Sequence, residues 1–560
     1  MNYKSKLALL ISKHIDKEIS EELIEIPPNP KLGDFAFPCF NLAKILKKAP
    51  AVIASELVQE LKADFISEIK PIGPYVNFFV KKKLLAKKAL TKIYTNKDKY
   101  GSDSINEGIM IESPSPNTNK PLHLGHVRNM LLGNSIVNLY KKIGYDAKRV
   151  EIVNDRGVHI CKSMLAYQKF GNNKEPDKKS DHFVGDYYVL YNTKEKETPE
   201  FKDEIQEMLV KWENNDEDVR TLWKKMNNWA TKGFKETYNR YGADIDEHNY
   251  ESDFYELGRD IVLDAFDKGL LKKDENKNIY YSDNEVEKKI VLRGDGTTIY
   301  MTQDMALANI RYNKYKIKNM VYVVASEQNH HFKVLFKIFK MLNREYADHC
   351  YHLGYGMIYL PEGKMKSREG TVVDADSMAN DIHNLAKNEI VKRYPDLNPK
   401  IVESRAESIG MGAIKFFILK YDSMKDFVFD PKESLSFEGE TGPYVQYTHA
   451  RCASVLKKHG RLTNNIDFSK LDTVEDKKIL KLLENLPETV KKAALEYKPS
   501  LITRLLLDLC QAFNEYYHKH QILNDDDKEL EKARILLVNG VKQVLAIGLN
   551  LLGIDALDEM

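Results

Sequence analysis

The chain has 560 residues and a nearly balanced charge, with 85 Lys and Arg against 83 Asp and Glu. This length predicts roughly three to four domains. The net charge of +2 excludes binding of nucleic acid through a uniformly basic surface, so any such binding needs local patches. The five cysteines are scattered without a CxxC pair, which argues for reduced thiols and against structural zinc or a disulfide framework. With no membrane-length apolar run and no N-terminal signal, we expect a cytoplasmic protein without membrane association.

The first 100 residues are expected to form a separate α/β domain. Apolar residues from Leu7 to Ile15 recur at helical spacing, and a turn-rich stretch precedes a second predicted helix, Phe40 to Leu46. The segment from Ile72 to Val80 is typical of a turn that leads into an aromatic strand.

Residues 109–153 predict one βαβ unit. Residues 109–111 form an apolar run typical of a buried parallel strand, and residues 113–121 are too rich in Pro, Ser and Asn for helix or strand. Helical periodicity then begins near His126 and ends at Gly144, and Val150–Val153 supplies a second strand. The polar loop therefore follows the carboxyl end of a strand, where open α/β sheets bind ligands.

The residue types in this loop suit a nucleotide triphosphate. A helix N-terminus presents free N–H groups to phosphate, and His123 and His126 can donate hydrogen bonds to an oxyanion. Gly125 leaves room for a flat base, and Lys120 adds a positive charge. The alternatives are a pair of ordinary loop histidines or a metal site. No third His or Cys lies at a useful spacing, so we predict no protein-bound metal.

Two longer motifs make the pattern specific. Residues 115–126, SPNTNKPLHLGH, resemble the HIGH signature of class I aminoacyl-tRNA synthetases, and residues 363–373, GKMKSREGTVV, resemble their KMSKS loop. Arginyl-tRNA synthetases in particular are similar to this chain in three places: the form of the first motif, residues 295–304 and the C-terminal segment 540–560. The resemblance covers essentially the whole chain.

The resemblance implies an α/β fold: a class I Rossmann-like catalytic domain, an N-terminal α/β tRNA-elbow domain and a C-terminal all-α anticodon-binding bundle. The implied limits are 1–100 for the elbow domain, 101–380 for the catalytic domain with a mostly helical insertion at about 170–290, 381–440 for a connecting helical region, and 441–560 for the bundle. From about residue 380 onward the pattern itself is helical to the end.

To recognise the amino acid, a carboxylate is the best partner, because it can bind the guanidinium of arginine through two hydrogen bonds. Asp304 is the first choice, and Tyr300 shares its face if this stretch is helical. The residues that the resemblance assigns to arginine are Glu112, Ser115, Asn117, His126, Tyr300, Asp304 and Gln328. His330 and His331 could contact adenosine or could simply be polar residues at a helix start, and we favour the second interpretation for His331.

For ATP and catalysis, the implied residues are His123, Gly125, His126, Lys364 and Met365 for binding, and His123, His126, Lys120, Lys364 and Lys366 for catalysis, with Mg²⁺ as the accompanying ion. The second lysine of KMSKS is replaced by Ser367. We predict that Lys120 supplies the missing charge, because it precedes the histidine turn.

For tRNA, the implied contacts are Tyr75 and Asn77 at the elbow, and Tyr444, Arg451 and Met560 at the anticodon. Aromatic rings, amides and arginines suit unstacked bases. The alternatives are that Tyr75 and Asn77 belong to the core and that Tyr444 and Tyr447 seal the bundle.

We therefore predict a monomeric ligase that uses ATP to activate L-arginine as the adenylate, with release of pyrophosphate, and then transfers arginine to the 3′-terminal ribose of tRNA(Arg). The rivals are a glutamate or glutamine synthetase, a small-metabolite adenylyltransferase and an inactive RNA-binding paralogue. Glu112 and Asp304 argue against an acidic substrate. The KMSK-like loop and the terminal bundle argue against the metabolite enzyme, and the presence of His123, His126 and Lys364 argues against the paralogue.

Overall fold

The computed structural model describes residues 3–27, 29, 32–198, 200–359, 361, 373–462, 465–523 and 526–560. The chain divides into two compact units, which are described separately. The first comprises Met1–Lys97, Val455–Glu484 and Ala512–Val541, and the second comprises Asp98–Ser454, Asn485–Gln511 and Lys542–Met560. The C-terminal helices are thus shared between the units, and the predicted domain limits stay predictions.

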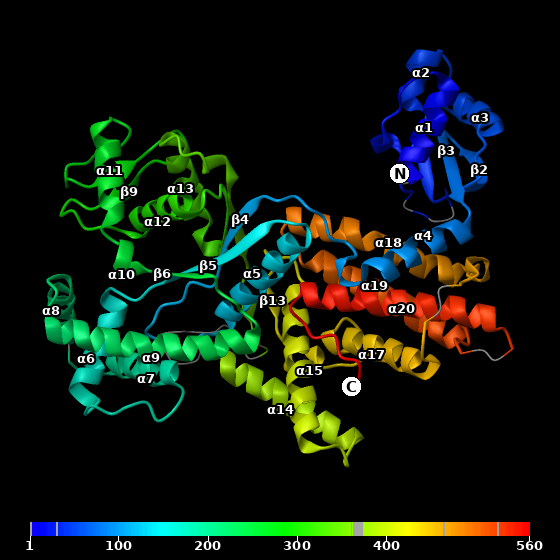
Figure 1. Cartoon of the computed structure of the whole chain (residues 1–560). Coiled ribbons are helices and arrows are strands. Elements are labelled where there is room, and N and C mark those ends of the chain that lie inside the picture. The colour runs from blue at the N-terminus through cyan, green and yellow to red at the C-terminus, as the bar shows by residue number, and fades with distance from the viewer. Residues whose placement is uncertain are drawn as a thin grey trace. The chain divides into compact units, whose positions relative to one another are not determined.

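In the first unit, helices pack on a three-stranded antiparallel sheet of order β1-β3-β2, with α3 beside β2 and β3 (Figure 1). The elements are α1 (Tyr3–Ile15), β1 (Phe35–Pro38), α2 (Phe40–Leu46), α3 (Pro50–Glu60), β2 (Ile66–Ile72), β3 (Tyr75–Val80) and α4 (Lys82–Asn96). Leu7 and Ile11 of α1 are fully buried with Phe37 and Phe78 of the sheet. The two predicted helices and the aromatic strand are confirmed.

The second unit is built on a five-stranded parallel sheet of order β11-β10-β4-β5-β6. Its strands are β4 (Gly108–Glu112), β5 (Asp146–Val153), β6 (Glu247–Tyr250), β10 (Asn319–Ala325) and β11 (Cys350–Tyr355). From β4 the chain adds β5 and β6 on one side and then β10 and β11 on the other. The order reverses between β4 and β10, and open α/β sheets bind their ligands at the carboxyl ends of strands at such a point.

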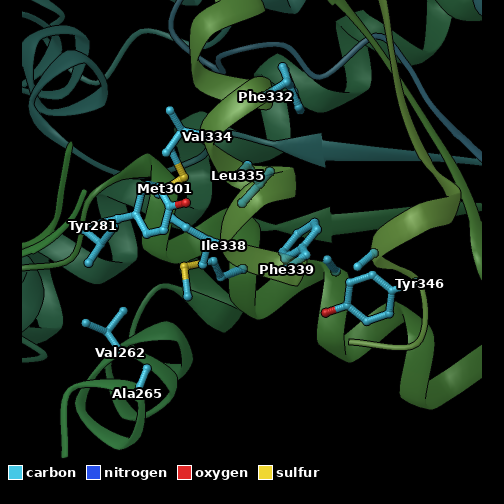
Figure 2. Packing of buried hydrophobic residues seen from close by; sticks show 14 of the residues in the cluster. Val262, Ala265, Tyr281, Met301, Phe332, Val334, Leu335, Ile338, Phe339 and Tyr346 are labelled. Atoms are coloured by element: carbon cyan, nitrogen blue, oxygen red, sulfur yellow. The ribbon is translucent and has the colours of Figure 1, made fainter. Parts of the chain in front are cut away.

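Crossover helices bury the faces of this sheet. They include α5 (Leu124–Lys142), α6 (Val158–Phe170), α12 (Tyr300–Tyr315) and α13 (Asn329–Met341). Figure 2 shows Leu335, Ile338 and Phe339 of α13 gathered with Met301 of α12 in one cluster, and each of these side chains is at most 1 % exposed. Burial of each large apolar side chain contributes about 1.5–3 kcal/mol. This core holds the carboxyl end of β10 and the start of α13 in place.

The predicted insertion at 170–290 is helical only in part. It contains α7 (Ser180–Lys194), α8 (Phe201–Glu213), α9 (Glu217–Tyr241), α10 (Glu251–Phe254) and α11 (Leu257–Asp267). However, β6 lies inside this range and pairs in parallel with β5, while β7 (Lys272–Lys273), β8 (Ile279–Tyr281) and β9 (Lys289–Leu292) form an antiparallel sheet. The helical prediction is therefore wrong for these segments. The sequence of β6, EHNY, has no apolar run because β6 is an edge strand with one neighbour.

The chain beyond residue 373 is mostly helical, as predicted. The helices are α14 (Ala375–Arg393), α15 (Pro399–Leu419), α16 (Pro431–Ser434), α17 (Gly442–His459), α18 (Val474–Leu495), α19 (Ser500–Lys519) and α20 (Lys528–Leu551). One exception is β13 (Phe427–Val428), which pairs in parallel with β12 (Ile358–Tyr359). Among the described residues, only α20 has the length and composition of a membrane span, and 67 % of its apolar window is buried inside the structure.

Candidate active site at the carboxyl end of the central sheet

The start of α5 brings the two signature histidines together. His123 is the N-cap residue, and its Nδ1 accepts a hydrogen bond from the Gly125 backbone N–H at 3.1 Å. The Nδ1 of His126 accepts from the backbone N–H of His123, also at 3.1 Å. The two rings lie 3.9 Å apart between centroids. His123 thus replaces the Ser, Asp or Asn side chain that commonly caps a helix, and His126 takes the place of the Glu or Gln of a capping box.

Electrostatics keep both imidazoles neutral. Burial, and then the charge of Lys120, lowers the pKa of His123 to about 4, and burial lowers the pKa of His126 well below its usual value. Burial also lowers the pKa of the Lys120 ammonium. Because Nδ1 of each neutral ring accepts a backbone hydrogen bond, the ring proton resides on Nε2. The site therefore offers two N–H donors at a helix N-terminus, which is the arrangement that suits an oxyanion.

A cavity of about 220 Å³ is lined in part by His123. Its lining includes Lys120 and His123 from the signature loop, His182 and Tyr188 from α7, and Asp374 at the N-cap of α14. The cavity thus joins the signature loop to the inserted helices.

The KMSK-like loop cannot be placed: Lys364, Met365 and Lys366 lie outside the described residues. The residues that follow it do contact the first signature. The Leu124 N–H donates to the Val373 carbonyl at 3.0 Å, and the Ala375 N–H donates to the Leu122 carbonyl at 2.9 Å. Val373, the last residue of the second motif, and Ala375 therefore lie beside the first signature, although a long insertion separates them in sequence.

Of the two predicted arginine carboxylates, Glu112 already has an internal partner. It lies at the end of β4, only 6 % exposed, and forms a short ion pair with Arg311 of α12. Burial raises the pKa of Glu112, and the Arg311 guanidinium opposes this effect. Arg311 also donates through Nε to Asn249 at 2.9 Å. The sequence did not indicate this pair: the seven-residue spacing places Arg311 on the same face of α12 as Asp304, but it does not specify which strand residue that face meets.

Asp304 also has a partner that the sequence did not reveal. Residues 300–315 are helical as the shared-face prediction requires, which places Tyr300 and Asp304 one turn apart on α12, and Tyr300 is 66 % exposed. The Asp304 Oδ2 lies 2.6 Å from Nε2 of His331 at the start of α13. His331 does lie at a helix start, as the favoured interpretation has it, and the structure adds its pairing with Asp304.

The remaining predicted arginine ligands lie near the strand ends. Ser115 has a φ of 57°, and its hydroxyl accepts a hydrogen bond from the Ile152 N–H at 3.1 Å, so its oxygen already holds the loop against β5. Asn117 forms a β-bridge with Asn154. Gln328 is exposed at the N-cap position of α13, past the end of β10. Their contacts with arginine stay predictions.

The predicted tRNA contact Asn77 is buried. Its side chain is 3 % exposed and donates to the Tyr75 carbonyl at 3.4 Å, which contradicts its prediction as a surface contact for a base edge. Tyr75 is partly exposed and packs edge-on against Phe40 at 5.9 Å. The sequence could not distinguish these two residues, because residues two apart in a strand share one face of the sheet, and tertiary packing decides how much of that face is covered at each position.

In the second unit, Tyr444 and Arg451 lie two turns apart on α17 and are both partly exposed. The Arg451 guanidinium lies 4.9 Å from the ring centroid of Tyr447, which is 39 % exposed and so does not seal the bundle. Met560 packs against the buried cluster between α14 and α15. The tRNA contacts of Tyr444, Arg451 and Met560 stay predictions.

Comparisons with known proteins agree with this architecture. Three family models match: the arginyl tRNA synthetase N-terminal domain over residues 1–80, the class I (R) tRNA synthetase catalytic domain over 89–431, and the DALR anticodon-binding domain over 445–560. The chain is 44 % identical to an arginine–tRNA ligase of Treponema denticola, covering 97 % of this chain and 96 % of that protein. It is 37 % identical to one of Clostridium botulinum over the full length of both.

Solved structures give the same result. The arginyl-tRNA synthetase of Thermus thermophilus matches with a TM-score of 0.83 at 25 % identity, with 100 % of both chains covered. A methionyl-tRNA synthetase of Mycobacterium tuberculosis shares the fold alone, with a TM-score of 0.51 over 80 % of this chain and 91 % of that one, at 10 % identity. The chain is a class I aminoacyl-tRNA synthetase and belongs to the arginine–tRNA ligase family.

Proposed function

We propose that the start of α5 is the centre at which this ligase activates arginine. The observation that supports this role is the paired capping of His123 and His126, which leaves one Nε2–H donor on each neutral ring. When the arginine carboxylate attacks the α-phosphate of ATP, negative charge develops on the phosphate oxygens. Fixed donors stabilise such charge without reorganising, which is a large catalytic contribution.

Lys120 supports the same step through its charge. It lines the cavity beside His123 and lowers the pKa of both imidazoles, so it lies within electrostatic reach of the phosphate site. With Ser367 in the place of the usual second lysine, Lys120 supplies the cation, and Lys364, Met365 and Lys366 of the KMSK-like loop complete ATP binding with Gly125. The motifs require no general base, so orientation and electrostatics drive both steps.

Mg²⁺ enters as the companion of ATP. The described residues contain one group that could hold a metal, Asp181, His182 and Asp376. The Lys179 ammonium lies 2.9 Å from Asp181 and 2.8 Å from Asp376, so this donor set is already neutralised and does not fit a resident divalent cation. The ion is therefore bound chiefly by the triphosphate oxygens that it prefers.

Arginine is selected by carboxylate charge at the strand ends. Asp304 receives the guanidinium, and Tyr300 covers it from the same helical face. Glu112 contributes carboxylate charge from the end of β4, where it is paired with Arg311 of α12. Asn117, Ser115, Gln328 and His126 bind the α-amino and carboxylate groups. The second step transfers arginine from the adenylate to the terminal ribose of tRNA(Arg).

The tRNA is held outside the catalytic region. Tyr75 contacts its elbow from a domain of residues 1–100, and Tyr444 and Arg451 contact the anticodon from a bundle of residues 441–560. The catalytic domain is 101–380, and 381–440 connects it to the bundle. The matched family segments 1–80, 89–431 and 445–560 support a division into three parts, and the separate region 381–440 rests on the sequence pattern alone. We expect a cytoplasmic monomer without membrane association.

The decisive test is to charge total tRNA with each labelled amino acid in turn, in the presence of ATP and Mg²⁺. A His126→Ala variant is the matched inactive control. Product from arginine alone supports the assignment. Product from another amino acid would refute the roles of Asp304 and Tyr300. Absence of product from folded protein would favour the metabolite adenylyltransferase or the RNA-binding paralogue.

A further inference from the structure

Asp304 and His331 form a pair between two helices. Asp304 lies one turn into α12, and His331 lies in the first turn of α13, just past the end of β10. Their side chains are 20 % and 14 % exposed, and the distance from Oδ2 to Nε2 is 2.6 Å. Both the Nε2-protonated neutral ring and the imidazolium can donate this hydrogen bond.

The position of His331 is set by the core. Its neighbour Phe332 is buried in the cluster of Figure 2 and stacks on His352 of β11 at 4.4 Å. His352 is in turn held by the Val324 carbonyl of β10 through Nε2 at 3.0 Å. The His331 ring also lies edge-on to Phe332 at 5.4 Å. The imidazole of His331 therefore lies at the start of α13, where the neighbouring Phe332 packs against β11.

The neighbouring carboxylates have cations of their own. Glu112 is paired with Arg311, and Glu251 lies 3.7 Å from a guanidinium nitrogen of Arg156. Within the described ranges, the ion pair with His331 is the only one that Asp304 makes. Asp304 thus differs from the other two, because its partner is a histidine that contacts one oxygen, whereas Glu112 and Glu251 each already lie beside a guanidinium.

We propose that His331 is a positioning residue for amino-acid specificity: it holds Asp304 by Oδ2 so that the remaining lone pairs of the carboxylate face the substrate guanidinium. A carboxylate has about four acceptor sites and His331 uses one, so the others stay open for a guanidinium. The inference rests on the proposed role of Asp304 in binding arginine. Locking the rotamer before arginine arrives reduces the ordering cost of binding.

The test compares KM for arginine with KM for ATP and with kcat in tRNA charging. His331→Leu should raise KM for arginine about 10- to 100-fold, the range expected for losing a hydrogen bond to a charged group, and leave KM for ATP and kcat nearly unchanged. His331→Gln, which retains an N–H donor, should recover most of the affinity. His349→Leu, at an exposed histidine just before β11 and outside the predicted site, is the matched control.

Asp304→Asn separates the inference from the function on which it rests. If Asp304→Asn leaves KM for arginine unchanged, the proposed role of Asp304 itself is wrong. If Asp304→Asn impairs arginine binding and His331→Leu does not, only the positioning role is wrong. In the Asp304→Asn background, His331→Leu should have little further effect on KM for arginine. A fully additive increase in KM for arginine in that background would overturn the proposal. So would a His331→Leu variant that raises KM for ATP as much as KM for arginine and lowers the melting temperature.

Discussion

Replacement of Arg128 should destabilise the second unit strongly, because its guanidinium connects α5 to two other chain segments. Arg128 is 1 % exposed and donates to the carbonyls of Gly356 at 2.6 Å, Ser423 at 2.8 Å and Lys425 at 2.8 Å. It also makes two longer contacts to adjacent carbonyls and lies 4.9 Å from the Phe427 ring. Burial lowers its pKa to about 10, so it stays charged at neutral pH.

The expected cost of Arg128→Met follows from these contacts. Each hydrogen bond from a charged group contributes about 1.5–3 kcal/mol, so three short bonds would sum to roughly 5–9 kcal/mol. Removing the guanidinium also removes the penalty of its own burial. We therefore expect a net loss of about 3–5 kcal/mol in the free energy of unfolding, because the three carbonyls are left without these donors while the burial penalty of the charge is relieved. Arg128→Lys keeps three donors, so its free energy of unfolding should lie between those of the wild type and Arg128→Met.

Urea unfolding followed by tryptophan fluorescence measures this loss directly. Trp212, Trp223 and Trp229 all lie on α8 and α9 in the second unit, so the signal reports on that unit. Arg504→Met is the matched control, because Arg504 is 65 % exposed and pairs only at the surface, where a loss of at most about 1 kcal/mol is expected. Equal midpoints for Arg128→Met and Arg504→Met would refute the reasoning.

Three further outcomes are expected. Lys120→Ala should slow arginine-dependent ATP–pyrophosphate exchange by about 10²-fold, as for other electrostatic groups at reacting phosphates or oxyanions; a near-normal rate would contradict its assigned role. A hydrogen bond with Asp376 raises the pKa of His182 in the folded protein. The stability that protonated His182 contributes is therefore complete below the unfolded-state pKa of about 6.5 and is lost as pH rises through the folded-state pKa. The gap in urea midpoint between wild type and His182→Gln should therefore narrow from pH 6 to pH 9, and a constant gap would exclude this linkage. Gly133→Ala would make a Cβ overlap the Ser113 hydroxyl, so a loss of about 1–3 kcal/mol in the free energy of unfolding is expected from overpacking; an unchanged melting temperature would show that the loop shifts freely.

The sequence alone was sufficient for the local elements near the site. The run Ile109–Ile111, the polar loop and the helix that begins beside His126 were each recognisable, because apolar periodicity and Pro- and Asn-rich loops are local signals. The family followed from two motifs far apart in the chain. The edge strand β6 was missed, because a polar strand with one neighbour leaves no periodic signal.

The residue types by themselves predicted a nucleotide site at a helix N-terminus and offered Asp304 as a candidate carboxylate for arginine. Only the tertiary structure decided which carboxylate remains available and what holds it. Arg311 reaches Glu112 from 199 residues away, and His331 reaches Asp304 from another helix. It likewise placed Asn77 in the core and Arg128 among carbonyls of two distant segments. Such contacts depend on how helices pack across a sheet, which local periodicity does not encode.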